Sequence, residues 1–313
     1  MTRDQKIRIA MIVCAMIVAC AVILSMTDIA GLAGTYVSGE KYTAGDTEIA
    51  GTVSSLDIHW TSGKVTVEYH RENTVLLRET SDRALKEDQQ MRWLLDGNTL
   101  RVQYMKSGLR LNTGLQKELT VTLPEGMKLD EASFSLTSGD LFIPALKAEK
   151  LVLDVTSGDV TAAAEAERTE AHATSGALRL TLTGEAKAVK AGTTSGTIRL
   201  EAEKADSIVA DSTSGTVEIL ADEAGDTKIG STSGTVMVTL GKMKTLSVST
   251  TSGRVTAALP ADPGYTADIT TVSGRTDSTQ ALTRSGSKYT CGDGSADVRI
   301  STVSGDVRLE AAE

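Results

Sequence analysis

Large side chains and cysteines are scarce in this chain. Aromatic residues make up 3% of its 313 residues, and it has four prolines and three cysteines. Cys14 and Cys20 lie in an apolar N-terminal run, so Cys291 stands alone in the remainder and an intrachain disulfide there is excluded. Small and β-branched residues fill a thin, regular core better than large rings do. The composition therefore favours a narrow aliphatic core over the bulkier core of a typical globular enzyme.

Residues that carry catalytic chemistry are also sparse. His59, His70 and His172 are the three histidines, and they lie in different parts of the chain without the spacing of metal ligands. The sequence has no Ser-His-Asp order, no paired cysteine motif and no phosphate-binding glycine loop. We therefore expect no enzyme activity and no cofactor. A glycan hydrolase is the enzymatic alternative, and it would need a cleft with two close carboxylates.

Basic charge is also limited. The net charge is −9 at pH 7, and no basic stripe is present. This balance argues against nucleic acid and against anionic membrane surfaces as partners.

One tripeptide, Thr-Ser-Gly, dominates what is present. Between residues 139 and 253 its glycines recur every 18 to 20 residues, and the interval from residue 63 to residue 139 is 76, or four periods of 19. A fixed period near 20 is typical of a solenoid. The glycines that we expect to form a structural row of turns are Gly63, Gly139, Gly158, Gly176, Gly196, Gly215, Gly234, Gly253, Gly274 and Gly305.

Apolar residues alternate with polar ones on both sides of each glycine, as in a strand with one dry face. The apolar positions two residues after the glycine and five residues before it are seven residues apart. In a straight strand an odd separation would place these two sets of side chains on opposite faces. The Ser-Gly must therefore form a corner that turns both sets inward, and glycine reaches the positive φ that such a corner uses. We predict an all-β, single-domain β-solenoid of about 19 residues per coil, preceded by a transmembrane helix.

The N-terminus carries an uninterrupted apolar run over residues 9–26, with basic residues before it. The run is long enough to cross a bilayer, and the positive-inside rule places the N-terminus in the cytoplasm. We predict a single-pass protein of the bacterial cell membrane with a cytoplasmic tail (1–8), a membrane anchor (9–26) and a linker (27–50). A signal peptide cleaved after Ala33 is one alternative, and a lipoprotein signal at Cys20 is another.

The exported part, residues 51–313, departs from the period in two places. Residues 72–118 break the pattern, and their charged segment 83–95 fits either a short helix or an irregular excursion. We expect 72–118 to cap the open end of the solenoid, because an open end is an exposed sheet edge, with a binding site on the cap as the alternative. A further insertion of about 12 residues lies within 277–297, before a last coil at 296–309.

Acidic residues follow three of the repeated glycines. These residues are Asp140, Asp159 and Asp306, and they do not recur in consecutive repeats. The calcium-binding nonapeptide pattern is absent, so an isolated calcium site is the only metal alternative that the sequence leaves open.

Family likeness rests on three stretches. Leu119–Pro124 alternates and stops at proline, Phe134–Leu141 carries the motif Thr-Ser-Gly-Asp-Leu, and the serial Thr-Ser-Gly coils follow. Together they resemble the bacterial putative-adhesin family, a domain of unknown function, over about residues 50–310. The resemblance implies a β-solenoid in an envelope protein, and it assigns no catalytic residue.

The threonines of the motif should stack into a ladder along one edge of the solenoid. Such ladders stabilise sheet pairing through packed methyl groups and hydroxyl hydrogen bonds. Extended ligands such as glycans or peptides could also lie along the row, and ice binding is a further alternative. The candidate binding face consists of Thr156, Thr174, Thr194, Thr213, Thr232 and Thr251.

These observations favour a non-enzymatic, membrane-anchored envelope or surface protein that acts as an adhesin-like binding scaffold. Its expected partners are the membrane, through residues 9–26, and an envelope protein or glycan. The alternative is an accessory or regulatory protein of the envelope-stress response that acts with a membrane partner.

Overall fold

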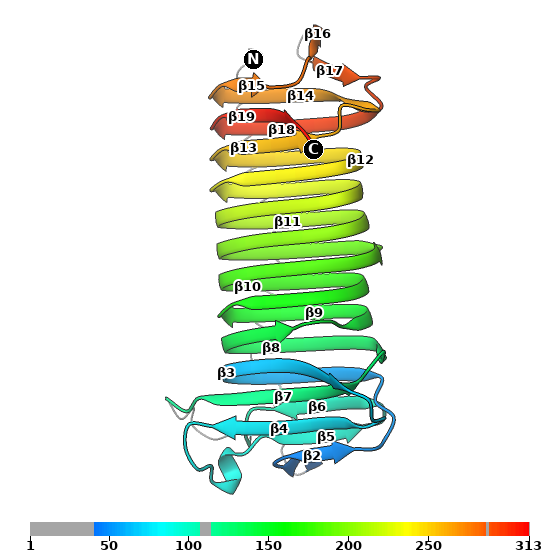
Figure 1. The fold of residues 1–313 in the computed structure, drawn as a ribbon. Coiled ribbons are helices and arrows are strands. Elements are labelled where there is room, and N and C mark those ends of the chain that lie inside the picture. Colours follow the sequence, from blue (N-terminus) through cyan, green and yellow to red (C-terminus); the bar gives the residue numbers. More distant parts are fainter. Residues whose placement is uncertain (1–40, 107–113, 286–287, 313) are drawn as a thin grey trace. The chain divides into compact units, whose positions relative to one another are not determined.

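The computed structural model describes residues 41–106, 114–285 and 288–312 (Figure 1). Within these ranges the chain consists of β-strands and their connections, including the 3-10 turn at Glu87–Gln89, and it has no α-helix. The predicted all-β, solenoid-like fold is therefore confirmed. No helix in the described ranges is long and apolar enough to cross a membrane. The predicted tail (1–8), the predicted anchor (9–26) and the linker up to residue 40 lie outside the described residues.

The described chain divides into two compact units. We name them the N-terminal unit (residues 41–106 and 114–182) and the C-terminal unit (residues 183–285 and 288–312). The elements of the N-terminal unit are β1 (Thr43–Ala44), β2 (Thr47–Ile49), β3 (Ser55–His70), β4 (Val75–Ser81), η2 (Glu87–Gln89), β5 (Arg92–Asp96), β6 (Thr99–Gln103), β7 (Lys117–Pro124), β8 (Lys128–Ile143), β9 (Lys147–Ser157) and most of β10 (Val160–Ala186). Those of the C-terminal unit are β11 (Ala188–Ser233), β12 (Val236–Ser252), β13 (Val255–Leu259), β14 (Gly264–Ser273), β15 (Thr276–Ser278), β16 (Thr283–Ser285), β17 (Lys288–Gly292), β18 (Ala296–Ser304) and β19 (Val307–Ala311).

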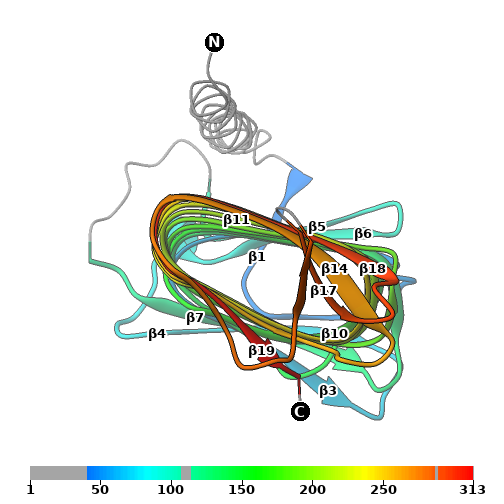
Figure 2. The same cartoon turned by 90° about the horizontal axis from the view of Figure 1, so that it is seen from above.

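Within each unit the chain winds in coils of parallel strands around an apolar interior (Figure 2). In the N-terminal unit β3 pairs with β8, β8 with β9, and β9 with β10, all in parallel. In the C-terminal unit the end of β11 pairs in parallel with β12. Parallel pairing follows from the repeat, because each coil presents the same strand in the same direction to the next coil.

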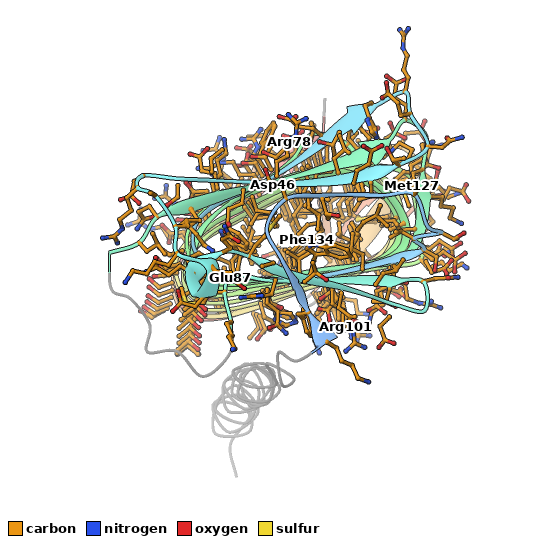
Figure 3. All side chains as sticks on the ribbon, turned by 90° about the horizontal axis from the view of Figure 1, so that it is seen from below. Asp46, Arg78, Glu87, Arg101, Met127 and Phe134 are labelled. Atoms are coloured by element: carbon orange, nitrogen blue, oxygen red, sulfur yellow. The ribbon has the colours of Figure 1, made fainter. Side chains whose placement is uncertain are left out.

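The core is a set of inward-facing rows. In the coil of Gly139 the side chains of Phe134 and Leu136, before the corner, and of Leu141 and Ile143, after it, are all buried. Figure 3 shows Phe134 inside the loop of the coil, whereas Arg101 lies at its outer face. The corner at Thr-Ser-Gly shifts the phase of the alternation by one residue, so apolar residues on both sides of it point inward. Each buried Leu, Ile or Phe side chain stabilises the fold by about 1.5–3 kcal/mol.

The first end of the N-terminal unit is closed by the segment that breaks the repeat. β6 and β7 pair with the two halves of β3, on the edge opposite to β8. β5 and β4 run antiparallel to β6 and β7, and β1 and β2 pair with β5 and β4 in turn. We name β1, β2 and β4–β7 with their connections the cap. Figure 3 looks onto this end and shows cap strands lying across it.

The cap accounts for the 76-residue interval between Gly63 and Gly139. Gly63 and Gly139 are register partners on neighbouring strands, so no coil lies between them. The length of the interval equals four periods, but the chain between β3 and β8 forms β4–β7, and β6 and β7 pair with the edge of β3 opposite to β8. Segment 83–95, which fitted a helix or an irregular excursion, contains the 3-10 turn η2 followed by the start of β5. Residues 43–49, inside the predicted linker, contribute β1 and β2 to the cap.

The C-terminal unit ends with its coils out of chain order. β18 pairs with β12 on one edge and with β14 on the other, and β19 lies in the same way between β13 and β15. The last coil of the sequence therefore sits between the coil of Gly253 and the coil of Gly274. The insertion predicted within 277–297 contains the β16–β17 hairpin, and β17 pairs with Gly264–Asp268 of β14.

Candidate functional site

The predicted glycine row lies at the corners of the coils. Gly63 and Gly176 have φ values of 105° and 115°, which side chains rarely tolerate. A Cβ atom on Gly158 would overlap the carbonyl oxygen of Gly139, and one on Gly215 would overlap that of Gly196. The row therefore consists of glycine because backbones of successive coils touch at the corner, which makes its role structural.

The predicted threonine row lies on the outer surface beside these corners. Thr156 is exposed, and the other members (Thr174, Thr194, Thr213, Thr232 and Thr251) are half-buried. The serine that follows each threonine is mostly exposed, and the serines of successive coils are register partners. In the N-terminal unit this row is Ser62, Ser138, Ser157 and Ser175, and in the C-terminal unit it includes Ser233, Ser252, Ser304 and Ser273. Each unit thus presents hydroxyl groups in a line, at the spacing of its coils.

Two of the three histidines lie in one polar column on the N-terminal unit. His59 is the register partner of Ser135, Ser135 of Asp154, and Asp154 of His172. The sequence separates these histidines widely, and only the coil registers bring them into line. No group of three His, Cys, Asp or Glu side chains in the described ranges is arranged to hold a metal ion.

Two carboxylates, Asp154 in this column and Asp57 beside it, have pKa values shifted by burial and by neighbouring charges. His59 Nε2 lies 2.9 Å from Asp57 Oδ1. Burial acts to raise the pKa of Asp57, but the hydrogen bond and charge of His59 and the charge of Arg101 outweigh it, so that pKa is lowered. Burial raises the pKa of Asp154, helped by the charge of Glu170 and opposed by His172. His70 is held elsewhere, with Nδ1 2.9 Å from Glu72 and Nε2 2.6 Å from the carbonyl oxygen of Thr74.

The carboxylates that follow the glycines connect neighbouring coils. Asp140 accepts a hydrogen bond from the backbone N–H of Asp159 at 2.9 Å, and Asp159 accepts one from Ala177 at 2.9 Å. The backbone hydrogen bond from Ala177 and the Arg179 guanidinium 3.0 Å away hold the pKa of Asp159 below its usual range. In the C-terminal unit Asp306 accepts the backbone N–H of Arg275 at 2.9 Å. These acids therefore link the backbones of neighbouring coils.

An exposed aromatic ring marks one wall of the N-terminal unit. Phe142 is 40% exposed in a chain with two phenylalanines, and its register partners in the adjacent coils are Thr66 and Thr161. The ammonium group of Lys64 lies 5.9 Å from the centre of the ring. We name Lys64, Thr66, Phe142 and Thr161 the Phe142 patch. A ring face beside hydroxyls and a charge combines apolar contact with hydrogen bonding.

The most buried polar cluster lies in the cap, around Lys117. The Lys117 side chain is 0% exposed, and its Nζ is 2.5 Å from Oε1 of Glu79, which is 3% exposed. The same ammonium group donates to the carbonyl oxygens of Gln89, at 2.8 Å, and Tyr104. It lies 4.0 Å from the centre of the Tyr104 ring and 5.0 Å from that of Trp60. The charge of Lys117 is therefore compensated by an anion, two carbonyls and two ring faces.

Glu79 and Trp60 complete this cluster. Glu79 accepts the backbone N–H of Met91 at 3.0 Å, and the indole N–H of Trp60 donates to the carbonyl oxygen of Lys117 at 3.2 Å. Burial lowers the pKa of Lys117 and raises that of Glu79, while the charge of each partner opposes the shift. The cluster joins β3, β4, η2 and β7, and it is closed to solvent, so its role is to hold the cap. The sequence analysis did not predict this cluster, although the position of Lys117, on the inward face of the alternating strand 117–123, indicates a buried charge.

Comparison with known proteins settles the family. The model of the family described as Toastrack DUF4097 matches residues 54–310. The chain belongs to this family. No curated protein matches the chain.

The comparison with solved structures finds bacterial proteins at low sequence identity. A putative cell adhesion protein from Clostridium sporogenes is 13% identical, with 87% of this chain and 100% of that chain covered and a TM-score of 0.25. A putative adhesin from Bacteroides fragilis is 11% identical, with 88% and 98% covered and a TM-score of 0.39. A putative lipid binding protein from Parabacteroides distasonis is 11% identical, with 88% and 98% covered and a TM-score of 0.40.

Proposed function

We propose that this chain is a non-enzymatic binding scaffold of the bacterial cell envelope, adhesin-like and held in the membrane by residues 9–26. The observation that carries the proposal is the alignment of equivalent exposed side chains in straight rows within each unit. Ser157 lies beside Ser175, and Ser252 lies beside Ser304. An extended ligand with its own repeat, such as a glycan or a peptide strand, can contact such a row at several equally spaced points.

The Phe142 patch is the proposed anchoring point for such a ligand. Its ring is exposed beside the hydroxyls of Thr66 and Thr161, so apolar stacking and hydrogen bonds are available within one small area. Exposed aromatic side chains contribute a large share of the energy at binding surfaces. The patch therefore supplies affinity, and the rows of hydroxyls supply alignment.

Binding of the full chain to an array of bacterial glycans and extended peptides tests this proposal. We expect Phe142→Ser to weaken binding at least fivefold. Met237→Ser is the matched control, because Met237 is 38% exposed and also stands three residues after a coil glycine, in the C-terminal unit. Binding to no glycan or peptide would contradict the scaffold. Equal binding by both variants would place the contact outside the Phe142 patch, and chemical turnover of a bound glycan would contradict the non-enzymatic role.

The proposed location rests on the apolar run at 9–26 and the basic residues before it. We expect the intact N-terminus in the membrane fraction, with the C-terminus accessible to protease from outside the cell membrane. A mature N-terminus at residue 34 would instead show cleavage. Replacing residues 1–26 by an unrelated anchor should leave binding unchanged, whereas loss of a cellular phenotype on this exchange alone would favour the envelope-stress role.

A further inference from the structure

A row of buried hydroxyl groups runs inside the C-terminal unit. Each member stands three residues before a coil glycine and is at most 5% exposed. Ser231 is the register partner of Thr250, and Thr250 of Thr302. The hydroxyl row consists of Thr193, Ser212, Ser231, Thr250 and Thr302.

The same position in the N-terminal unit is apolar. There it is occupied by Trp60, Leu136, Val155 and Ala173, all of which are buried. Threonine has the shape of valine, and serine has two non-hydrogen atoms fewer than leucine. The hydroxyl row therefore places polar atoms where the N-terminal unit has apolar side chains.

None of the five hydroxyl oxygens has a hydrogen-bond partner among the described protein groups. A buried hydroxyl left unpaired costs about 1–3 kcal/mol. Five of them would cost about 5–15 kcal/mol, which is as large as the whole stability of a typical domain. The row must therefore be satisfied by something other than these protein groups.

Direct bonds between hydroxyls of successive coils are long: one residue before Thr250 and Thr302, Ser301 donates to Ser249 at 3.5 Å. Hydroxyls that repeat at the strand separation are about 4.8 Å apart, beyond the 2.7–2.8 Å of an O–H···O bond. A water oxygen placed between two of them, about 2.8 Å from each, makes an angle of about 118° at the water, close to tetrahedral. Buried waters are found where several polar partners surround enough room for one molecule.

We propose that the C-terminal unit binds an internal row of water molecules, one between each pair of neighbouring members of the hydroxyl row. The outermost coil offers an entry, because Thr271, the register partner of Thr302, is half-buried and donates to the carbonyl oxygen of Gly305 at 3.4 Å. The waters hydrogen-bond the hydroxyl above and the hydroxyl below. They link successive coils from inside, where the N-terminal unit uses apolar packing.

The test replaces one hydroxyl by a methyl group of the same shape in the full chain. Thr250→Val removes two water bridges, and we expect the folding equilibrium constant to fall by about tenfold in chemical denaturation. The matched control is Thr227→Val. Thr227 is equally buried and lacks a partner, but its register partner is Leu246 and Ile208 stands one period earlier, so it cannot join a row. Removal of this hydroxyl should leave the equilibrium constant unchanged or raise it.

A crystal structure of the full chain at a resolution that defines waters gives the direct readout. We expect one ordered water between Ser231 and Thr250 and another between Thr250 and Thr302, both absent in Thr250→Val. A dry row would overturn the proposal, even if Thr250→Val were destabilising, because the hydroxyls would then bond to the backbone. An unchanged or higher stability of Thr250→Val would overturn it as well.

Discussion

At its first end the N-terminal unit adds six strands beyond β3, whereas the C-terminal unit ends on β14 and β15. Only the first half of β14 has a second neighbour there, the antiparallel strand β17; among the described residues the outer edge of β15 pairs with nothing. The cap also holds a buried ion pair and Trp93, and the other tryptophan of the chain, Trp60, lies in the adjacent strand β3. One end is therefore closed by a dedicated structure and the other by rearranged coils.

The comparison also reveals a shared feature of the two ends. β3, the first coil strand in the chain, has parallel neighbours on both edges, and so do β18 and β19, the last coil strands. In both units the strand that begins or ends the repeat is paired on both edges. The outer layer is formed by other strands, β4–β7 with β1 and β2 at one end and β14–β17 at the other. The strands that begin and end the repeat are therefore not edge strands.

The largest effect should come from removing the inserted last coil. A chain that ends at Gly292 lacks β18 and β19, so β12–β13 and β14–β15 lose the strands between them. We expect amide hydrogen exchange in β12–β15 to accelerate by about 1,000-fold or more. A chain that ends at Ala312 is the control. Retained protection in β14 would mean that β14 can pair directly with β12, and that the order of coils matters less than their number.

The next effect concerns the ion pair of the cap. Lys117→Met leaves the Glu79 carboxylate buried without its cation, and we expect a loss of about 3–5 kcal/mol in the stability of the cap. Tryptophan fluorescence during denaturation reports this loss, because Trp60 and Trp93 both lie in the N-terminal unit, in β3 and in the cap strand β5. The double variant Lys117→Met/Glu79→Gln should recover part of it.

The matched control for Lys117 is Lys150→Met. Lys150 lies 2.8 Å from Glu131, but both side chains are more than 40% exposed, so the change should stay within about 1 kcal/mol. Equal effects of the two lysine variants would contradict the view that the cap depends on a desolvated pair.

The smallest effect is expected at the carboxylate that follows a coil glycine, because it makes only a local hydrogen bond to the next coil. Both units contain such carboxylates. The folded-state pKa of Asp159 is lowered by the backbone N–H of Ala177 and by Arg179. Its contribution to stability is therefore present above the unfolded pKa, near 3.8, and is lost as the pH falls through the folded value. Asp159→Asn should lower the stability slightly at pH 7, and the difference in stability between this variant and the wild type should shrink as the pH falls below 3.8. A constant difference across this range would show that the carboxylate charge contributes nothing.

Much of the coil was predictable from residue spacing alone. The alternation around each glycine and the odd step across it placed Phe134 and Leu141 inside and required a corner at Gly139. The hydroxyl row was also predictable, because Ser231 and Thr250 stand two residues after inward positions, but the predicted binding face included only the threonines of the Thr-Ser-Gly motif. The Phe142 patch and the histidine column were not predictable, since each needs the register between coils far apart in the chain.

The sequence by itself determined the strand-built coil, its period and its inward rows, because these follow from local alternation and from the close approach of backbones at each glycine. Only the tertiary structure decided which coil neighbours which. Near-identical repeats can pair with any other repeat, so the position of the last coil between those of Gly253 and Gly274 leaves no local signal. The same holds for the Lys117–Glu79 pair, whose stability depends on desolvation and on partners contributed by several strands of the cap.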